Sequence, residues 1–363
     1  MRPVALRRFR SGLSVAVLIL TFALAGTAQA PSAPVPAPAP PSTLPSTTQP
    51  PANDNNPAPQ NAAPQDPAPP ASQEPVGQEP ASNDPGMFVF KKQVEEVVLH
   101  ATVVDENRRP VPYLDRGAFS VFEAGSPQAI TSFRREDVPV AMGIVIDNSG
   151  SMRDKRDKVN QAVLNLIRAS NPQDEIFVVN FSQNYYLDQD FTSDTGLLER
   201  ALHQASTQGS TALYDAVVAS AVHLKNNPRL EKKVLLVITD GQDNMSQETL
   251  QEAAHQLQQS NGPSLYAVGL TGGDLRDSGR EALQRLSDGT GGVAFFPETL
   301  DDVGSITRSV AHDIRSQYTI AYKPHNQNSK PEFQSIRVEA RAPGYGRLTV
   351  RTRSGYYGTD TAR

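Results

Sequence analysis

The chain has 363 residues, no cysteine and a formal net charge of −5 at pH 7. Because cysteine is absent, disulfides, thiol catalysis and thiolate zinc sites are excluded. The composition has no surplus of basic residues, so nucleic acid is not an expected partner. The length is sufficient for one α/β domain of ordinary size with a smaller companion.

Residues 1–30 have the three parts of a secretory signal peptide. Residues 1–10 carry four arginines, Leu13 to Ala25 form an almost unbroken apolar run, and Ala28-Gln29-Ala30 has the pattern of a cleavage site. A membrane anchor is the alternative, but the apolar run is shorter than the roughly 20 residues that a spanning helix needs. We therefore predict cleavage after Ala30 and export to the periplasm, the cell surface or the medium.

Residues 31–85 contain 18 of the 30 prolines and no lysine or arginine. Alanine, serine, glutamine and asparagine make up most of the remainder, so almost no large apolar side chain is available for burial. This composition predicts a disordered, Pro-rich linker. Such a linker can hold a folded domain away from the cell envelope, or it can be a plain spacer.

The segments 86–137 and 316–358 have the pattern of β-strands. In the first, apolar residues occupy every second position from Val97 to Val103. In the second, three β-rich stretches are separated by turns that contain asparagine or proline. Each segment is too short to form a stable core alone, so we expect their strands to pair into one small β-sandwich around the domain inserted between them.

Residues 138–315 alternate between apolar runs and helical patterns. Four continuous apolar runs, at 140–146, 176–181, 234–238 and 265–270, are typical of parallel strands buried on both faces. The expected fold class is α/β, with a doubly wound and mostly parallel sheet. In that architecture, ligands bind beside the carboxyl ends of the strands.

Oxygen-bearing side chains follow these strands in three loops. Asp147, Ser149 and Ser151 come directly after the first run, Thr211 opens a helix, and Asp240 follows the run at 234–238. Carboxylates and hydroxyls brought together at one sheet edge suit a small hard cation. The sequence therefore predicts a divalent cation site, with Mg²⁺ favoured and Mn²⁺ or Ca²⁺ as alternatives.

The pattern Asp147-x-Ser149-x-Ser151, followed by Thr211 and Asp240, resembles the metal-ion-dependent adhesion site of von Willebrand factor type A domains. The resemblance covers roughly residues 138–315. It implies a doubly wound sheet and a metal ion that captures an acidic residue of a protein ligand. By the same resemblance, the three hydroxyl residues are direct metal ligands, and the two aspartates bind the ion directly or through water.

The flanking segments carry a second, looser resemblance. Residues 119–123 and 353–357 are similar to segments of bacterial von Willebrand factor A-related proteins, found notably in Acidobacteria. The family is also known for a shift of its final helix that couples metal ligation to affinity. The predicted last helix at 301–316 leads into the terminal β segment, so a transmitted shift is a hypothesis for this chain.

Each piece of the motif has a simpler explanation when it is taken alone. Residues 147–151 are compatible with a turn, Thr211 with a helix cap, and residues 239–241 with an ordinary strand end. Their joint occurrence, in order, favours the site. Asp243 and Asn244 are candidates for supporting Asp240.

Enzymatic functions find little support in the sequence. The six histidines form no H-E-x-x-H pair, and no G-x-S-x-G element occurs. No glycine-rich phosphate loop follows a strand, so nucleotide binding is not expected. A metal-assisted hydrolase is the remaining enzymatic alternative, but the hydroxyl-rich motif offers no evident base.

The favoured hypothesis is an exported adhesion module that captures an Asp or Glu of a protein partner through a metal ion. Two segments are candidates for the rim of this site: 183–190, with Tyr185 and Tyr186, and 242–247. The alternative is a structural scaffold, or an accessory subunit of a cell-envelope assembly. In either case, association with the cell envelope is an expected setting.

Overall fold

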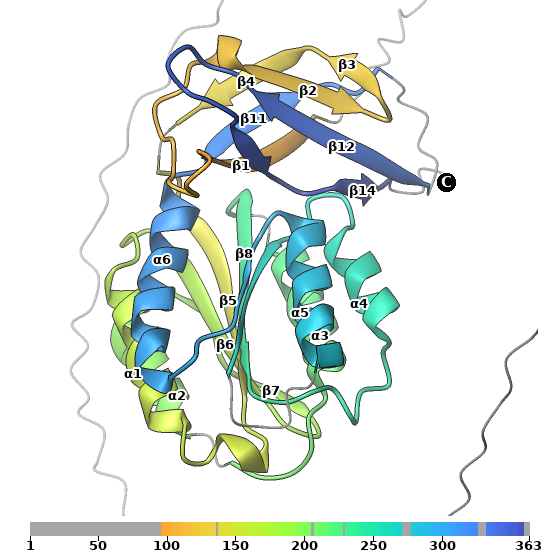
Figure 1. Cartoon of the computed structure of the whole chain (residues 1–363). Coiled ribbons are helices and arrows are strands. Elements are labelled where there is room, and N and C mark those ends of the chain that lie inside the picture. The colour runs from red at the N-terminus through yellow and green to blue at the C-terminus, as the bar shows by residue number, and fades with distance from the viewer. Residues whose placement is uncertain are drawn as a thin grey trace, which may run out of the picture. The chain divides into compact units, whose positions relative to one another are not determined.

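The computed structural model describes residues 96–135, 137–204, 207–227, 229–270, 277–325 and 332–358 (Figure 1). The predicted signal peptide, the predicted linker and the first ten residues of the predicted N-terminal β segment lie outside these ranges. Within them, no helix is both long and apolar enough to cross a membrane.

A six-stranded sheet forms the centre of the α/β part, in the order β10-β9-β8-β5-β6-β7. Its strands are β5 (Val140–Asp147), β6 (Glu175–Phe181), β7 (Tyr185–Thr192), β8 (Lys232–Thr239), β9 (Ser264–Gly269) and β10 (Ala294–Phe295). All neighbours pair in parallel except β7, which runs antiparallel to β6 at one edge. The expected doubly wound, mostly parallel sheet is confirmed.

The order of the strands places a switch point in the middle of the sheet. From β5 the chain builds outward to β6 and β7, then returns to add β8, β9 and β10 on the other side. Loops therefore leave the carboxyl ends of β5 and β8 in different directions. A crevice between them is the usual ligand site of such sheets.

Helices cover both faces of the sheet (Figure 1). They are α1 (Arg156–Arg168), α2 (Thr195–Gln204) and α6 (Val303–Arg315) on one face, and α3 (Leu213–Lys225), α4 (Leu250–Leu257) and α5 (Asp277–Thr290) on the other. Short 3-10 turns lie at Arg116–Ala118, Gly150–Met152 and Leu300–Asp302.

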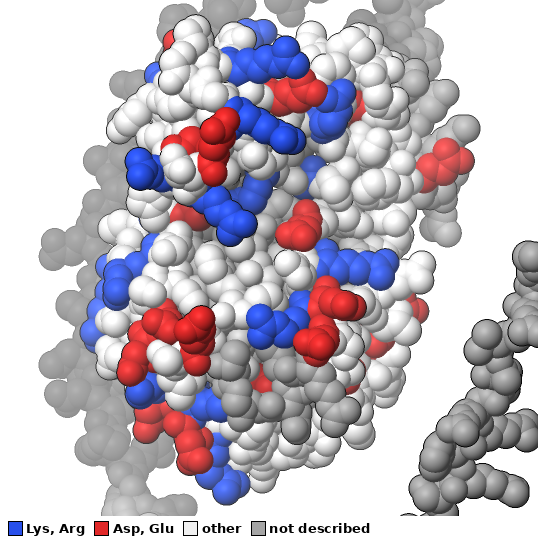
Figure 2. All heavy atoms as spheres, viewed as in Figure 1, with Lys and Arg blue, Asp and Glu red and all other residues white. Residues whose placement is uncertain are grey.

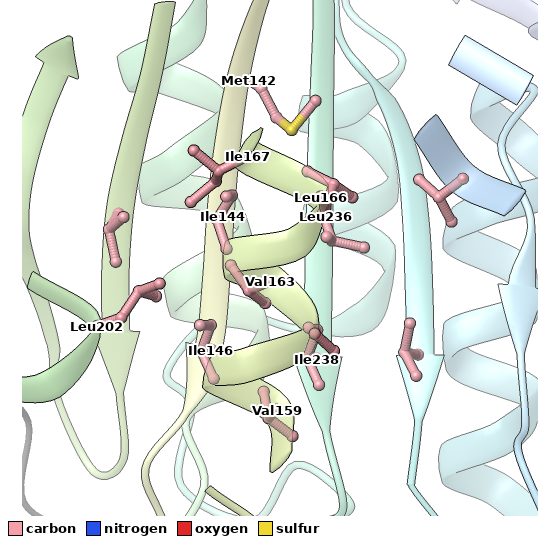
Figure 3. Close-up of a cluster of buried hydrophobic side chains, with 14 of the residues drawn as sticks. Met142, Ile144, Ile146, Val159, Val163, Leu166, Ile167, Leu202, Leu236 and Ile238 are labelled. Carbon is pink, nitrogen blue, oxygen red and sulfur yellow. The ribbon is translucent and has the colours of Figure 1, made fainter. Parts of the chain in front are cut away.

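Strand β5 has no polar side chain before its last residue, because both of its faces are buried. Met142, Ile144 and Ile146 pack under α1, whereas Ala141 and Val145 belong to the core beneath α3. Figure 3 shows the first of these cores, with Val163 of α1 lying over the sheet. Because both faces of the strand are covered, polar residues are confined to its end, where the loop begins.

Two four-stranded antiparallel sheets form the β part, in the orders β13-β1-β11-β4 and β14-β12-β2-β3. The strands are β1 (Val97–Val104), β2 (Phe119–Glu123), β3 (Ser126–Gln128), β4 (Ile130–Arg134), β11 (Tyr318–Tyr322), β12 (Phe333–Ala340), β13 (Thr349–Arg351) and β14 (Gly355–Tyr357). The two sheets share one core, to which Leu99 and Ile320 contribute from one sheet and Val121 and Val338 from the other. Each sheet thus combines strands from both ends of the described chain, as expected for a sandwich with an insertion.

Acidic and basic side chains are interspersed on the face of the molecule shown in Figure 2. This agrees with the small net charge of the chain, −5. The face offers no broad field of one sign to steer a charged partner.

Candidate functional site

The carboxyl ends of β5 and β8 bring two aspartates to the switch point of the sheet. Asp147 is the last residue of β5, and Asp240 directly follows β8; neither is accessible to solvent. The strands pair in parallel up to Ile146 and Ile238, so their ends lie side by side. Two carboxylates are therefore buried next to each other, which is costly unless positive charge or hydrogen bonds compensate them.

Serine hydroxyls connect the two carboxylates. The backbone N–H of Ser149 donates to Asp147 Oδ1 at 2.7 Å, and the hydroxyls of Ser149 and Ser151 lie 3.1 Å apart. The Ser151 hydroxyl in turn donates to Asp240 Oδ1 at 2.8 Å. Hydrogen bonds through the backbone N–H of Ser149 and the two serine hydroxyls thus link the loop after β5 to the loop after β8.

Thr211 reaches the same place from a third loop. A Cβ atom placed on Gly241 would lie 3.2 Å from Thr211 Oγ1 and 3.9 Å from Asp147 Oδ2, so the hydroxyl and the carboxylate flank this glycine. Asn244 holds the threonine from the other side: its Oδ1 accepts from the Thr211 N–H at 2.9 Å, and its N–H donates to the Thr211 carbonyl at 3.0 Å. The structure therefore brings all five predicted residues together.

Burial raises the pKa of the Asp147 carboxyl above its ordinary value, and the nearby Asp240 adds to the rise. Hydrogen bonds from Thr239 and Ser149 oppose it; the Thr239 hydroxyl donates to Asp147 Oδ2 at 2.5 Å. A negative charge on Asp147 is thus disfavoured by its surroundings. A cation bound beside it would relieve that cost.

Lys155 supplies one positive charge inside the site. Its Nζ pairs with Asp240 Oδ2, and its side chain is only 12% exposed. The residue lies in the turn between the 3-10 turn at 150–152 and α1, four positions after Ser151. Neither Lys155 nor Thr239 is among the residues that the sequence predicts for the site, although Lys155 lies one turn after the motif and Thr239 immediately precedes Asp240.

Asp243 and Asn244 do not contact Asp240 through any hydrogen bond of the described residues. Asp243 instead accepts from the Tyr214 N–H at 3.1 Å and from the Ser246 hydroxyl, at the start of α3. Asn244 positions Thr211. The candidate supporting residues therefore organise the loop at 242–247 and the α3 terminus rather than the carboxylate.

Arg156 packs beneath the site and is 6% exposed. Its guanidinium donates to the Asp147 carbonyl at 3.2 Å and to Asn180 Oδ1. Burial lowers the pKa of Arg156 to about 10, and Asp147 and Asp188 act in the opposite direction. The residue remains a cation at neutral pH and fixes the end of β5 from below.

The donor set fits a hard divalent cation. Two carboxylates and three hydroxyls are oxygen ligands of the kind that Mg²⁺ and Mn²⁺ take, and the two aspartates balance the charge of the ion. Over the described ranges, no group of three or more His, Cys, Asp or Glu side chains is placed to hold a metal. Three of the five oxygens would be those of neutral hydroxyls, so a cation here would keep an attraction for one further anionic ligand.

The two candidate rim segments differ in their structure. Residues 183–190 lead into and form most of β7, the edge strand, where Tyr185 is 49% exposed and Tyr186 59% exposed. Residues 242–247 form a loop beside Thr211, in which Met245 is 55% exposed. Exposed aromatic and sulfur-bearing side chains therefore lie on segments next to the site.

The family model of the von Willebrand factor type A domain matches residues 142–242. Among solved structures, proximal thread matrix protein 1 from the mussel byssus is 17% identical over 52% of this chain and 50% of that chain, with a TM-score of 0.44. This chain thus spans half the length of the mussel protein, another structure of which has a zinc-occupied MIDAS motif.

Two bacterial structures also match. The conserved hypothetical protein BatB from Bacteroides thetaiotaomicron is 17% identical over 48% of this chain and 97% of that chain, with a TM-score of 0.40. A von Willebrand factor type A protein from Catenulispora acidiphila is 14% identical over 75% of this chain and 76% of that chain, with a TM-score of 0.43. The search of curated proteins found no match.

Proposed function

Because the chain contains a von Willebrand factor type A domain, we propose that it is an exported binding module that captures an acidic residue of a protein partner through a divalent cation. The single observation that supports this most is the meeting of three loops around two buried carboxylates. Asp147, Ser149, Ser151, Thr211 and Asp240 would hold the ion.

The neutral hydroxyls decide what the bound ion can do. When three of the protein ligands carry no charge, the ion keeps a strong attraction for one more carboxylate, which an Asp or Glu of a partner supplies. Mg²⁺ is the proposed ion, because a compact set of hydroxyl and carboxylate oxygens suits its small octahedral shell. Mn²⁺ and Ca²⁺ are the ions to compare with it.

We propose binding rather than catalysis for this site. Lys155 is engaged with Asp240, and Arg156 is engaged with backbone and amide oxygens, so neither is placed as a general base. The proposed export depends on residues 1–30 of the sequence, with their arginines, apolar run and cleavage pattern.

A scaffold role, alone or as an accessory subunit of a cell-envelope assembly, is the second candidate. One observation favours it: Lys155 already provides a positive charge for the buried Asp240. A site that carries its own counterion can be folded without metal. The metal would then be dispensable, and any partner would bind elsewhere.

Calorimetric titration of Mg²⁺ and Mn²⁺ into the metal-free full chain separates these candidates. We expect the wild type to bind and the Ser149→Ala and Thr211→Ala variants to lose at least about tenfold in affinity, because each removes one metal-facing oxygen. Ser210→Ala is the matched control, since it removes a hydroxyl from the same loop without touching the donor set.

Capture of partner proteins then tests the function itself. Proteins of the cell surface should bind the immobilised wild-type chain in Mg²⁺ and be released by EDTA, and the Asp147→Ala variant should not retain them. The metal-dependent function would be ruled out if the wild type and Ser149→Ala bound the metal equally well. It would also be ruled out if partner proteins stayed bound in EDTA and were retained by Asp147→Ala as well. Either result would favour the scaffold.

A further inference from the structure

A pocket of about 280 Å³ opens beside the candidate metal site. Its wall is unusually rich in side-chain amides, which are those of Asn148, Asn180, Gln183, Gln204 and Gln208. Ser182, Tyr186 and Asp188 complete the polar lining. We call this the amide pocket; it includes no lysine or arginine among its lining residues.

The amide pocket is built from the same loops as the metal site. Asn148 is the residue after Asp147, and its carbonyl accepts from the Gln208 N–H at 2.8 Å. The Ser182 carbonyl, at the wall of the pocket, accepts from the N–H of Ala212, the residue after Thr211, at 2.7 Å. A ligand residue adjacent to one bound at the metal can therefore reach the pocket.

Asn148 carries the most specific signal in this wall. The residue is 4% exposed, and its Oδ1 is buried without a hydrogen-bond partner among the described residues. Its backbone is fully used, because the N–H donates to the Phe181 carbonyl at 2.6 Å and the carbonyl accepts from Gln208. A buried acceptor without a partner is costly, so a ligand that donates a hydrogen bond to this oxygen would be stabilised.

The neighbouring Asn180 does not share this property. Its Oδ1 accepts from Arg156, and its Nδ2 donates to Asp188 Oδ2 at 2.6 Å. The Asn180 amide thus forms a hydrogen-bonded bridge between the guanidinium of Arg156 and the carboxylate of Asp188. Both ends of the Asn180 amide are therefore engaged within the protein, whereas the Oδ1 of Asn148 is available to accept a hydrogen bond from a ligand.

The charges around the pocket favour a neutral donor over a cation. Asp147, Asp188 and Asp240 face two cationic side chains, Lys155 and Arg156, in addition to the divalent ion of the proposed function. No negative charge is then left for a ligand cation to neutralise. A carboxamide offers two N–H donors and a carbonyl acceptor, whereas a hydroxyl offers a single O–H donor, so an amide can pair with more of the amides in the wall.

We propose that the amide pocket binds the side chain of a glutamine or asparagine that adjoins the metal-binding Asp or Glu of the protein partner. The inference rests on the proposed metal-dependent function. The volume is near the lower end of ligand pockets, which gives room for one polar side chain. Tyr186, 59% exposed, stands at the wall and can cover the inserted group.

A set of blocked hexapeptides tests the proposal with the full chain. Each peptide carries one Asp in an otherwise Ala and Gly background, with Gln, Leu, Lys or Glu next to the Asp on either side. In Mg²⁺, we expect the best Gln peptide to bind about tenfold more tightly than the matched Leu peptide. Calorimetry or fluorescence anisotropy measures the difference.

Two substitutions of Asn148 make the test specific. Asn148→Leu should remove the advantage of Gln and leave Mg²⁺ affinity unchanged, whereas Asn148→Asp should move the preference to the Lys peptide, because it adds a negative charge to the wall. Asn184→Leu is the matched control: this exposed residue uses its carbonyl, not its side chain, to accept from the Ser182 N–H.

The outcomes distinguish this proposal from the function on which it rests. A Gln preference that depends on Asn148 but persists in EDTA would support the pocket and contradict the metal-dependent function. Equal binding of the Gln and Leu peptides in Mg²⁺, an advantage that survives in Asn148→Leu, or binding of no peptide would overturn the pocket proposal. A response to neutral monosaccharides alone would also overturn it, since the ligand would then be a glycan.

Discussion

If a metal ion binds as proposed, Lys155 competes with it for the carboxylate of Asp240. The ammonium pairs with Asp240 Oδ2, and the carboxylate is fully buried. Asp240 Oδ1 is meanwhile held by the Ser151 hydroxyl. The lysine therefore stabilises the metal-free site, and by the same contact it makes the carboxylate less available to an ion.

Substitution of Lys155 should separate these two effects. We predict that Lys155→Met lowers the unfolding free energy of the metal-free chain by about 3 kcal/mol, because a buried carboxylate loses its partner. Mg²⁺ affinity should rise by about tenfold, because the ion no longer competes with the ammonium. Chemical denaturation in EDTA and calorimetry with Mg²⁺ measure the two quantities.

Lys158→Met is the matched control for this prediction. It removes the same charge only three residues further along the chain, in the first turn of α1, but Lys158 pairs with Asp301 at the surface, where the side chains are 55% and 82% exposed. Both quantities should therefore stay near the wild-type values. A fall in Mg²⁺ affinity in Lys155→Met would show that the lysine supports the bound ion instead of excluding it.

The residues of the candidate site could be predicted to different degrees. The five proposed metal-binding residues follow from strand ends and from a spaced pattern, which are local features of the sequence. Position beside the motif marks Lys155 and Thr239 as neighbours of the site, but their roles and that of Asn148 depend on contacts between separate loops, which a local pattern does not contain. The unpaired oxygen of Asn148, in particular, exists only once the surrounding loops are in place.

The elements were predictable where burial imposes a pattern. Strands β5, β6, β8 and β9 are covered on both faces and have continuous apolar runs. The sequence does not predict strand β7 and indicates residues 183–190 only as a rim segment. As an edge strand with mostly exposed or half-buried residues, it has the sequence YYLDQDFT, in which neither alternation nor an apolar run stands out.

Near the end of α6, the carboxylate of Asp313 connects the α/β part to the sandwich. Asp313 accepts from the Tyr266 hydroxyl of β9 at 2.6 Å and from the Arg351 guanidinium of β13 at 2.7 Å. We predict that Asp313→Asn lowers the unfolding free energy by about 2 kcal/mol, since a largely buried charge pair is broken. Asp301→Asn, at the exposed end of the same helix region, should change it by less than about 0.5 kcal/mol.

Urea denaturation followed by fluorescence and by circular dichroism measures both variants. If the contacts of Asp313 contribute nothing to stability, the two variants will unfold at the same urea concentration. If Asp313 couples the parts, Asp313→Asn will unfold earlier, and the two signals will separate into distinct transitions.

Lys232, the first residue of β8, makes the same junction sensitive to pH. Its Nζ donates to the carbonyl of Ile314 in α6, and burial lowers the pKa of this 3% exposed side chain to about 8 from 10.5. Below pH 8 the lysine is protonated in both the folded and the unfolded chain, so the folded state carries the full cost of a buried charge. Between pH 8 and 10.5 the folded chain releases its proton first, so stability contributed by this group rises with pH.

We therefore predict a gain in unfolding free energy on the order of 3 kcal/mol between pH 8 and 10.5 from Lys232 alone. In Lys232→Met this gain should disappear, whereas Lys225→Met, which alters an exposed lysine at the end of α3, should retain it. Denaturation series at closely spaced pH values provide the measurement. A pH profile of Lys232→Met that parallels the wild type would contradict the assignment.

At the scale of the whole molecule, the α/β part enters and leaves the sandwich at one point. Arg134 of β4 pairs with Thr319 of β11, so the strands before and after the insertion are antiparallel neighbours. Just beyond them, Arg315 forms an ion pair with Asp137, at 2.8 Å. The sandwich also has a core that is separate from the two cores of the central sheet.

This arrangement predicts that the sandwich folds without its insertion. Replacing residues 136–317 by Asn-Gly would join Arg135 to Tyr318 through a two-residue turn, which is the favoured connection of antiparallel neighbours. The folded remainder of about 80 residues exceeds the size at which small domains need disulfides or metals. We expect a β-rich circular dichroism spectrum and a cooperative thermal transition, both abolished by Ile320→Asp in the fully buried core. An unfolded deletion chain would show instead that the sandwich depends on contacts such as that between Arg351 and Asp313, so that the two parts fold as one unit.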